Sequence, residues 1–207
     1  MKLKSLILTA VLTAIVCAPA NAGKHWVATW ATAEQVVEPH NCPPAPGLAN
    51  NSIRQIVQTS ISGKEVRVKF SNEFSQGPVT INAAEIAHAA TAGASSEIVA
   101  GTEVSLTFGG SKSVSSKPGE LVTSDPVKFP MAERQNVAIT MHLGEASSTS
   151  VTGHPGSRTD SYLIEGQGSD FSNAVKTAHW YIINAIEIKA EKKARAIVVL
   201  GNSITDG

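Results

Sequence analysis

Ser203 is the residue with the clearest chemical potential, and it lies in the stretch AIVVLGNSITDG at residues 196–207. Its spacing to the neighbouring glycines is Gly-x-Ser-x-x-x-Gly. Gly201 permits a sharp turn after the apolar run, which would place Ser203 near the start of a following helix. There its backbone N–H has no partner within the helix and can donate to a developing oxyanion. The pattern therefore predicts a serine nucleophile that also contributes an oxyanion donor.

Two other interpretations of this turn remain open from the residues alone. A serine between a strand and a helix is commonly a capping residue with no chemical role, and Asp206 would then be an acid in the first helical turn. A glycine turn after a strand can also bind phosphate, but the sequence lacks the Gly-x-x-x-x-Gly-Lys-Ser/Thr motif.

The apolar run in front of the turn predicts the element that would position Ser203. AIVVL shows no alternation and is rich in β-branched residues, which suits a strand buried on both faces in a parallel α/β sheet. Sites in such sheets lie at the carboxyl ends of strands, where Ser203 follows. The charged stretch AEKKARA at residues 190–196 indicates a domain boundary in front of this strand.

Residues 25–189 carry a different pattern, in which apolar and polar side chains alternate. In EVRVKFS the apolar residues are Val66, Val68 and Phe70, and the same period of two recurs in NVAITMHL and WYIINAIEIKA. Glycine and proline turn pairs separate these runs. Such runs are typical of antiparallel strands with one face on a core. Residues 23–190 are therefore predicted to form a β-sandwich or jelly-roll-like domain of roughly eight to ten strands.

The stretch VVLGNSITDG resembles the first conserved block of the SGNH, or GDSL-type, hydrolases, a family of lipases, esterases and other acylhydrolases. The usual form of that block is Gly-Asp-Ser-Ile-Thr-Asp-Gly. Four stretches further upstream are similar to a secreted branch of the family that carries a β-rich domain ahead of the hydrolase fold. They are WVATWATA, IRQIVQTSISGKEVRVKFSNEF, TGHPGSRTDSY and HWYIINAIEI.

This resemblance implies that Ser203 is the nucleophile of an ester hydrolase, with Gly201 and Asn202 in supporting positions. Asn202 stands where the family usually has aspartate; its amide keeps the shape and hydrogen-bonding capacity but carries no charge. The family takes its other site residues, an oxyanion-donating glycine and asparagine and an Asp-x-x-His, from later blocks. We therefore expect residues 191–207 to be the start of a truncated hydrolase domain. The chain would be the N-terminal portion of a longer protein and inactive alone. Small-molecule or carbohydrate esters are the expected substrates, and no cofactor is expected.

Residues 1–22 have the parts of a secretory signal peptide: two lysines, a short apolar run and the small-x-small motif Ala20-Asn21-Ala22. Cleavage after Ala22 would make the protein secreted or periplasmic. A lipoprotein processed at Cys17 is the weaker alternative, because Val16 occupies a position where a small residue is preferred.

The remaining composition excludes several classes of function. Loss of residues 1–22 removes two lysines and no acid, so the net charge changes from 0 to −2. Without a basic patch, a nucleic-acid partner is not expected, and no later run is long and apolar enough for a membrane span. Cys42 would be the one remaining cysteine, so there is no internal disulfide framework. It would be a free thiol or the partner of a cysteine further along the chain.

Other residues with chemical potential have simpler structural interpretations. His154 in TGHPGS could contact a ligand, but Pro155-Gly156 favours a turn or packing role, and His179 in a strand is interpreted as a structural histidine. No histidine has metal-ligand spacing. Trp26, Trp30 and Trp180 could stack on sugar rings, although tryptophans on half-buried strands are more often packing residues. They leave a second hypothesis, in which the β region is a non-catalytic module that binds glycan or packs against the hydrolase domain.

Overall fold

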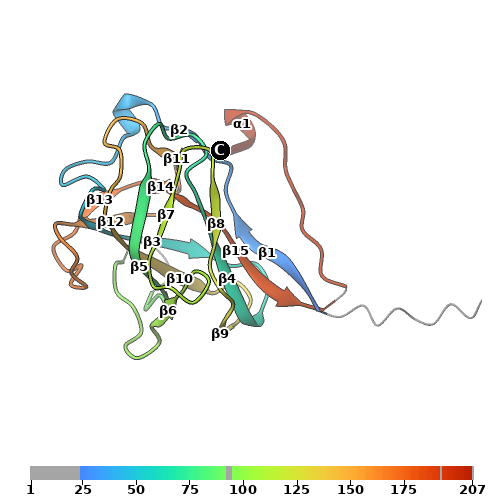
Figure 1. Ribbon diagram of the computed structural model, residues 1–207. Coiled ribbons are helices and arrows are strands. Elements are labelled where there is room, and N and C mark those ends of the chain that lie inside the picture. The colour runs from blue at the N-terminus through green and yellow to red at the C-terminus, as the bar shows by residue number, and fades with distance from the viewer. Residues whose placement is uncertain (1–23, 92–94, 192, 207) are drawn as a thin grey trace, which may run out of the picture.

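The computed structural model describes residues 24–91, 95–191 and 193–206 (Figure 1). Within these ranges the chain is mainly β, which confirms the fold class predicted from the alternating apolar pattern. It forms fifteen strands, more than the expected number, because several edge segments pair over only two or three residues. A 3-10 turn, η1 (Pro39–Asn41), and a short helix, α1 (Ser203–Asp206), complete the elements. The predicted signal peptide lies outside the described residues.

The strands form three antiparallel sheets. The five-stranded sheet has the order β1 (His25–Ala31), β15 (Ile183–Ala190), β4 (Gly63–Ser71), β8 (Leu121–Thr123), with β9 (Val127–Met131) also paired to β4. The seven-stranded sheet has the order β13 (Val175–Thr177), β12 (Ser161–Ile164), β3 (Ser52–Gln58), β10 (Asn136–Leu143), β5 (Val79–His88), β6 (Val104–Leu106), with β7 (Val114–Ser116) paired to β5. The three-stranded sheet has the order β14 (His179–Tyr181), β11 (Thr152–Pro155), β2 (Gln35–Val36).

The two larger sheets enclose one apolar core. Buried side chains from the five-stranded sheet, such as Val68 and Phe70 on β4, belong to the same cluster as Ile139 and Met141 on β10 of the seven-stranded sheet. The predicted inward positions of the alternating runs are therefore confirmed. Cys42 is a free, partly buried thiol that packs against this core.

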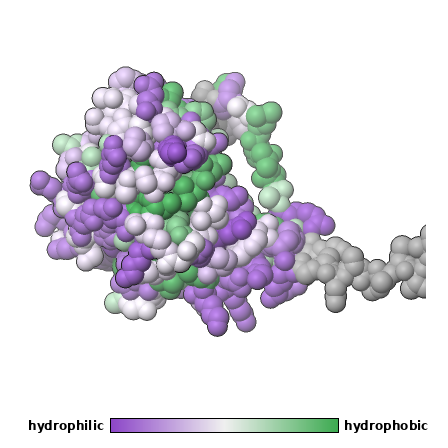
Figure 2. All heavy atoms as spheres, viewed as in Figure 1, coloured by the Kyte–Doolittle hydropathy of each residue, from purple (hydrophilic) through white to green (hydrophobic). Residues whose placement is uncertain are grey.

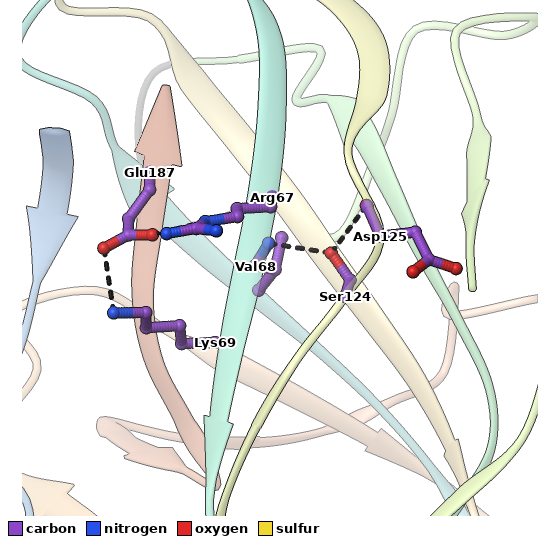
Figure 3. Close-up of polar contacts among 6 residues, drawn as sticks. All are labelled: Arg67, Val68, Lys69, Ser124, Asp125 and Glu187. Carbon is purple, nitrogen blue, oxygen red and sulfur yellow. Dashed lines mark hydrogen bonds and ion pairs between the residues drawn. The ribbon is translucent and has the colours of Figure 1, made fainter. Parts of the chain in front are cut away.

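Polar contacts hold both neighbours of β4 in place (Figure 3). On one side, Glu187 of β15 receives a hydrogen bond from Arg67 Nε at 2.6 Å and pairs with Lys69 Nζ at 2.8 Å. On the other side, Ser124 lies between β8 and β9, and its Oγ accepts the Val68 N–H at 2.9 Å. The same hydroxyl donates to the carbonyl of Asp125 at 3.1 Å. Side chains on both sides of β4 therefore add to the backbone ladders that fix its place in the sheet.

The run WYIINAIEIKA, expected as one strand, is divided at Ile182. This residue has a φ of 67°, which is uncommon for a β-branched side chain. Its N–H donates to Thr152 O at 3.0 Å, and its carbonyl accepts the Ser71 N–H at 2.7 Å. The chain turns there, so β14 joins the three-stranded sheet and β15 joins the five-stranded sheet. This division places Trp180 beside β11 rather than in the sheet that contains Ile186.

The strand predicted at residues 196–200 is not formed in this structure. The segment leaves β15 and runs back past β1 to α1 (Figure 1) without a ladder to any described strand. Its apolar side chains are uncovered: Ile197 is 92% and Leu200 97% exposed. Figure 2 shows them as an apolar column that stands apart from the body of the domain. A central strand needs hydrogen-bonded neighbours on both sides, and none of the described strands pairs with this segment.

The double variant Ile197→Lys, Val198→Lys should self-associate less than the unchanged 207-residue chain, because it removes exposed apolar surface. Its thermal unfolding midpoint should stay within about 2 °C of that of the unchanged chain, since substitutions at exposed positions rarely change stability by much. Light scattering and thermal unfolding measure the two quantities. Val99→Lys is the matched control, because Val99 is an isolated valine that is 45% exposed. A large fall in the midpoint would contradict the uncovered position of this segment.

Candidate active site

The turn that carries Ser203 is closed by its neighbour Asn202. The Asn202 side-chain Oδ1 accepts the Ile204 N–H at 3.0 Å, and its backbone carbonyl accepts the Thr205 N–H at 2.9 Å. Asn202 therefore caps α1, and Ser203 is the first residue of the helix, as the sequence predicts. Asparagine and aspartate are equally good helix caps. The departure from the usual Gly-Asp-Ser form thus leaves the local shape intact.

Gly201 is required by its contact with Thr205. A Cβ at position 201 would lie 2.5 Å from Thr205 Cβ and 2.9 Å from its Cγ2. Any larger residue would push the helix away from the preceding chain. The glycine was expected for a sharp turn, and the structure adds this close approach as the reason.

The turn faces a hollow of about 530 Å³ on the β domain. One side is lined by the C-terminal segment, with Val199, Gly201, Asn202 and Thr205. The other side is lined by the loop after β1, by η1 and by β11, with Ala33, Gln35, Glu38, Asn41, His154 and Pro155. The site thus joins the predicted residues Gly201 and Asn202 to polar side chains that are distant in the sequence.

The pairing of β11 places His154 at this hollow. β11 lies between β2 and β14, and Gly153 on it allows the three strands to approach closely. A Cβ at position 153 would lie 2.6 Å from the Trp180 carbonyl oxygen and 2.9 Å from Val37 Cγ2. His154 then packs against Trp180, with ring centroids 5.9 Å apart and an angle of 27°.

Gly153→Ala should destabilise the domain by about 1–3 kcal/mol, because the added methyl group meets backbone as well as side chains. Urea unfolding of the 207-residue chain measures the change. Gly77→Ala is the control, since its Cβ would have no neighbour closer than 3.9 Å. Equal stability of the two variants would show that β11 can shift without cost.

The protonation pattern of His154 is set by its contact with the loop after β1. Its Nδ1 lies 2.8 Å from the carbonyl oxygen of Ala33. A carbonyl oxygen only accepts hydrogen bonds, so Nδ1 carries the hydrogen that His154 donates to Ala33. The prediction of a turn and packing role was incomplete, because the same side chain also lines the hollow.

Glu38 is the carboxylate on this wall. It accepts hydrogen bonds from Gln35 Nε2 at 2.7 Å and from Asn41 Nδ2 at 3.1 Å. The hydrogen bond from Asn41 is the main reason that the pKa of Glu38 is below its usual range. The wall opposite the serine turn is therefore polar and carries an ionised carboxylate at neutral pH.

Three other histidines, His88, His142 and His179, have ring nitrogens in contact with groups of the β domain. The His142 Nδ1 lies 2.8 Å from Ser52 Oγ, and the His88 Nδ1 lies 2.9 Å from Gln135 Nε2. The His179 Nδ1 accepts the Gly156 N–H at 3.0 Å, and burial lowers its pKa. Among the described residues no three His, Cys, Asp or Glu side chains are close enough to hold a metal ion. In the same ranges there is no helix with the length and apolar character needed to cross a bilayer.

The hollow brings together the turn that carries Ser203, a histidine with a defined tautomer and an ionised carboxylate. The contiguous residues of the turn were identified from the sequence. His154 was considered as a ligand contact but assigned to a turn or packing role, and Glu38 was not identified as a site residue. The chain matches no family model, and no curated protein matches it with significance.

Proposed function

We propose that the chain carries the nucleophile of a secreted or periplasmic serine ester hydrolase of the SGNH type. The proposal rests on the resemblance of VVLGNSITDG and the upstream stretches to that family. The single structural observation that favours it is the position of the capped Gly-Asn-Ser turn, which faces a polar hollow of the β domain. A capping serine alone would need no such hollow.

In the proposed reaction the Ser203 hydroxyl attacks the ester carbonyl. A base takes the hydroxyl proton, and the backbone N–H of Ser203 is one of the donors that stabilise the tetrahedral oxyanion. The intermediate then collapses to an acyl-enzyme, and the proton passes to the departing alcohol. Water then attacks the acyl-enzyme ester by the same steps, which releases the acid and restores the Ser203 hydroxyl. The resemblance assigns the base to an Asp-x-x-His that would follow residue 207 in the complete protein.

The polar wall of the hollow favours esters of polar alcohols. Gln35, Glu38 and Asn41 present amide and carboxylate groups on the side opposite the turn. Beyond the hydrogen bonds that they make to one another, such groups can bind hydroxyls, whereas an aliphatic alcohol offers them no additional hydrogen bond. Carbohydrate acyl esters are therefore the proposed substrate class.

Covalent labelling tests the proposal. An alkyl fluorophosphonate should modify the product of the complete reading frame at Ser203, as located by peptide mass spectrometry. Ser203→Ala should abolish the label, and Ser148→Ala, at an exposed loop serine, should leave it unchanged. A label at another serine, or none in a folded protein, would contradict the proposal.

A further inference from the structure

A second cleft lies next to the candidate active site and is bounded by two tryptophans. Its volume is about 410 Å³, within the usual range of small-ligand sites. Trp30 of β1 and Trp180 of β14 form its aromatic wall, and Ile56 and Val57 of β3 contribute apolar side chains. Polar residues line the rest: Gln58, Asn136, Ser157, Arg158 and Thr159.

The aromatic wall is rigid. The Trp30 and Trp180 rings meet edge to face, with centroids 4.9 Å apart and an angle of 79°. The Trp180 Nε1–H donates to the Ile56 carbonyl at 3.2 Å, and His154 packs on the same indole. Both tryptophans remain partly exposed at the cleft. A ligand that packs here would therefore meet an aromatic surface already held in one orientation.

Two hydrogen-bonding groups that line the cleft have no partner among the described residues. Gln58 and Asn136 lie opposite each other on β3 and β10. The Gln58 side chain is exposed and makes no hydrogen bond to a described residue, whereas the Asn136 Nδ2 lies 3.4 Å from the Thr91 carbonyl oxygen. The Thr159 Oγ1 is buried and has no partner in the described part of the chain. Buried polar atoms of this kind are usually satisfied, so the Thr159 hydroxyl keeps an unused hydrogen-bonding capacity at the lining of the cleft.

Arg158 adds a positive charge held in an unusual backbone conformation. Its φ is 57°, a left-handed value that is uncommon outside glycine. The side chain is exposed and forms no ion pair with any described residue. Strained residues cluster at ligand sites, where the surrounding structure maintains them.

We propose that this two-tryptophan cleft is a carbohydrate-binding site that takes a pyranose unit of an oligosaccharide. A pyranose has an apolar C–H face that packs on indole and a rim of hydroxyls that amides, Thr159 and Arg158 can bind. Neither a purely apolar ligand nor a small ion would use both kinds of surface. The site goes beyond the proposed hydrolysis, because sugar binding here needs neither Ser203 nor a catalytic base.

A glycan array of neutral and acidic hexose and hexosamine oligomers, probed with the 207-residue chain, tests the proposal. The glycan that binds best is then titrated by calorimetry. Arg158→Ala should weaken binding about tenfold, because it removes a hydrogen bond from a charged group. Trp180→Phe should weaken it several-fold through loss of indole surface.

Matched control variants distinguish loss of a contact in the cleft from a general effect of replacing an arginine or a tryptophan. Arg134→Ala removes an exposed arginine with a similar φ of 54° that does not line the cleft. Trp26→Phe changes a tryptophan that packs against Arg67 instead. Both should bind normally, as should Ser203→Ala, so failure of the proposed hydrolysis leaves this test intact. Binding to no glycan, or binding unaffected by Arg158→Ala and Trp180→Phe, would overturn the proposal.

Discussion

Ester hydrolysis by the product of the complete reading frame is expected to fall by about 10³-fold or more when Ser203 is replaced by alanine. Removal of the nucleophile eliminates the acyl-enzyme route, and any remaining rate would come from the oxyanion donors and substrate binding. Hydrolysis of an aryl acetate measures the change. Ser148→Ala is the control and should retain the full rate.

The 207-residue chain is expected to show negligible turnover in the same assay, because the proposed base lies outside it. General-base assistance alone is worth about 10²–10⁴-fold. The position of His154 in the hollow makes this comparison informative. If the 207-residue chain hydrolysed the ester and Ser203→Ala and His154→Ala each abolished that activity, the base would lie on β11 and the expected Asp-x-x-His would be unnecessary. Unchanged hydrolysis by the longer Ser203→Ala variant would leave Ser203 as a turn residue only.

Glu34→Gln is expected to stabilise the β domain above pH 7 by about 3 kcal/mol. Burial raises the pKa of Glu34 to about 7, and the nearby Glu73 carboxylate acts in the same direction. Its Oε2 accepts a hydrogen bond from Asn184 Nδ2 at 2.9 Å, whereas Oε1 is buried without a partner among the described residues. Hydrogen bonding by the Asn184 and Ser71 side chains opposes this rise, and the Ser71 hydroxyl also donates to Glu73 at 3.1 Å.

The pH dependence follows from the direction of this shift. The carboxyl has a pKa of 4.5 when unfolded and about 7 when folded, so the folded state binds the proton more tightly. Below pH 4.5, Glu34 is protonated in both states and does not lower the free energy of unfolding. As the pH rises from 4.5 to 7, the free energy of unfolding of the wild-type domain falls. Urea unfolding at pH 4, 6 and 8 should show the advantage of Glu34→Gln growing across this series. Glu133→Gln, at an exposed turn, should show no such trend, and a constant difference for Glu34→Gln would contradict the assignment.

Alternation in the sequence was sufficient to predict the β domain, because the side chains of Val66, Val68 and Phe70 must face one core. It could not predict which strands are neighbours, since pairing is set by contacts between distant segments. The division of the run WYIINAIEIKA into two strands at Ile182 was also not predictable from the sequence. Isoleucine strongly favours negative φ, and its left-handed conformation here is maintained by backbone hydrogen bonds to Thr152 and Ser71.

The candidate site was predictable only where its residues are contiguous. Gly201, Asn202 and Ser203 form a pattern that can be recognised in the sequence. Glu38 and His154 reach the same hollow through the pairing of β2 with β11 and the turn η1. No spacing in the sequence marks these two residues, and the same holds for Trp30 and Trp180, which β1 and β14 bring together.

Acid-quench mass spectrometry of the complete product during hydrolysis of an aryl acetate tests the central claim most directly. The account predicts an acetyl group on the peptide that contains Ser203, formed within the first turnover and lost as the substrate is consumed. The Ser203→Ala variant should carry no acetyl group on this peptide. Turnover without an adduct at Ser203, or an adduct at a different residue that persists in Ser203→Ala, would contradict the assignment of Ser203 as the nucleophile.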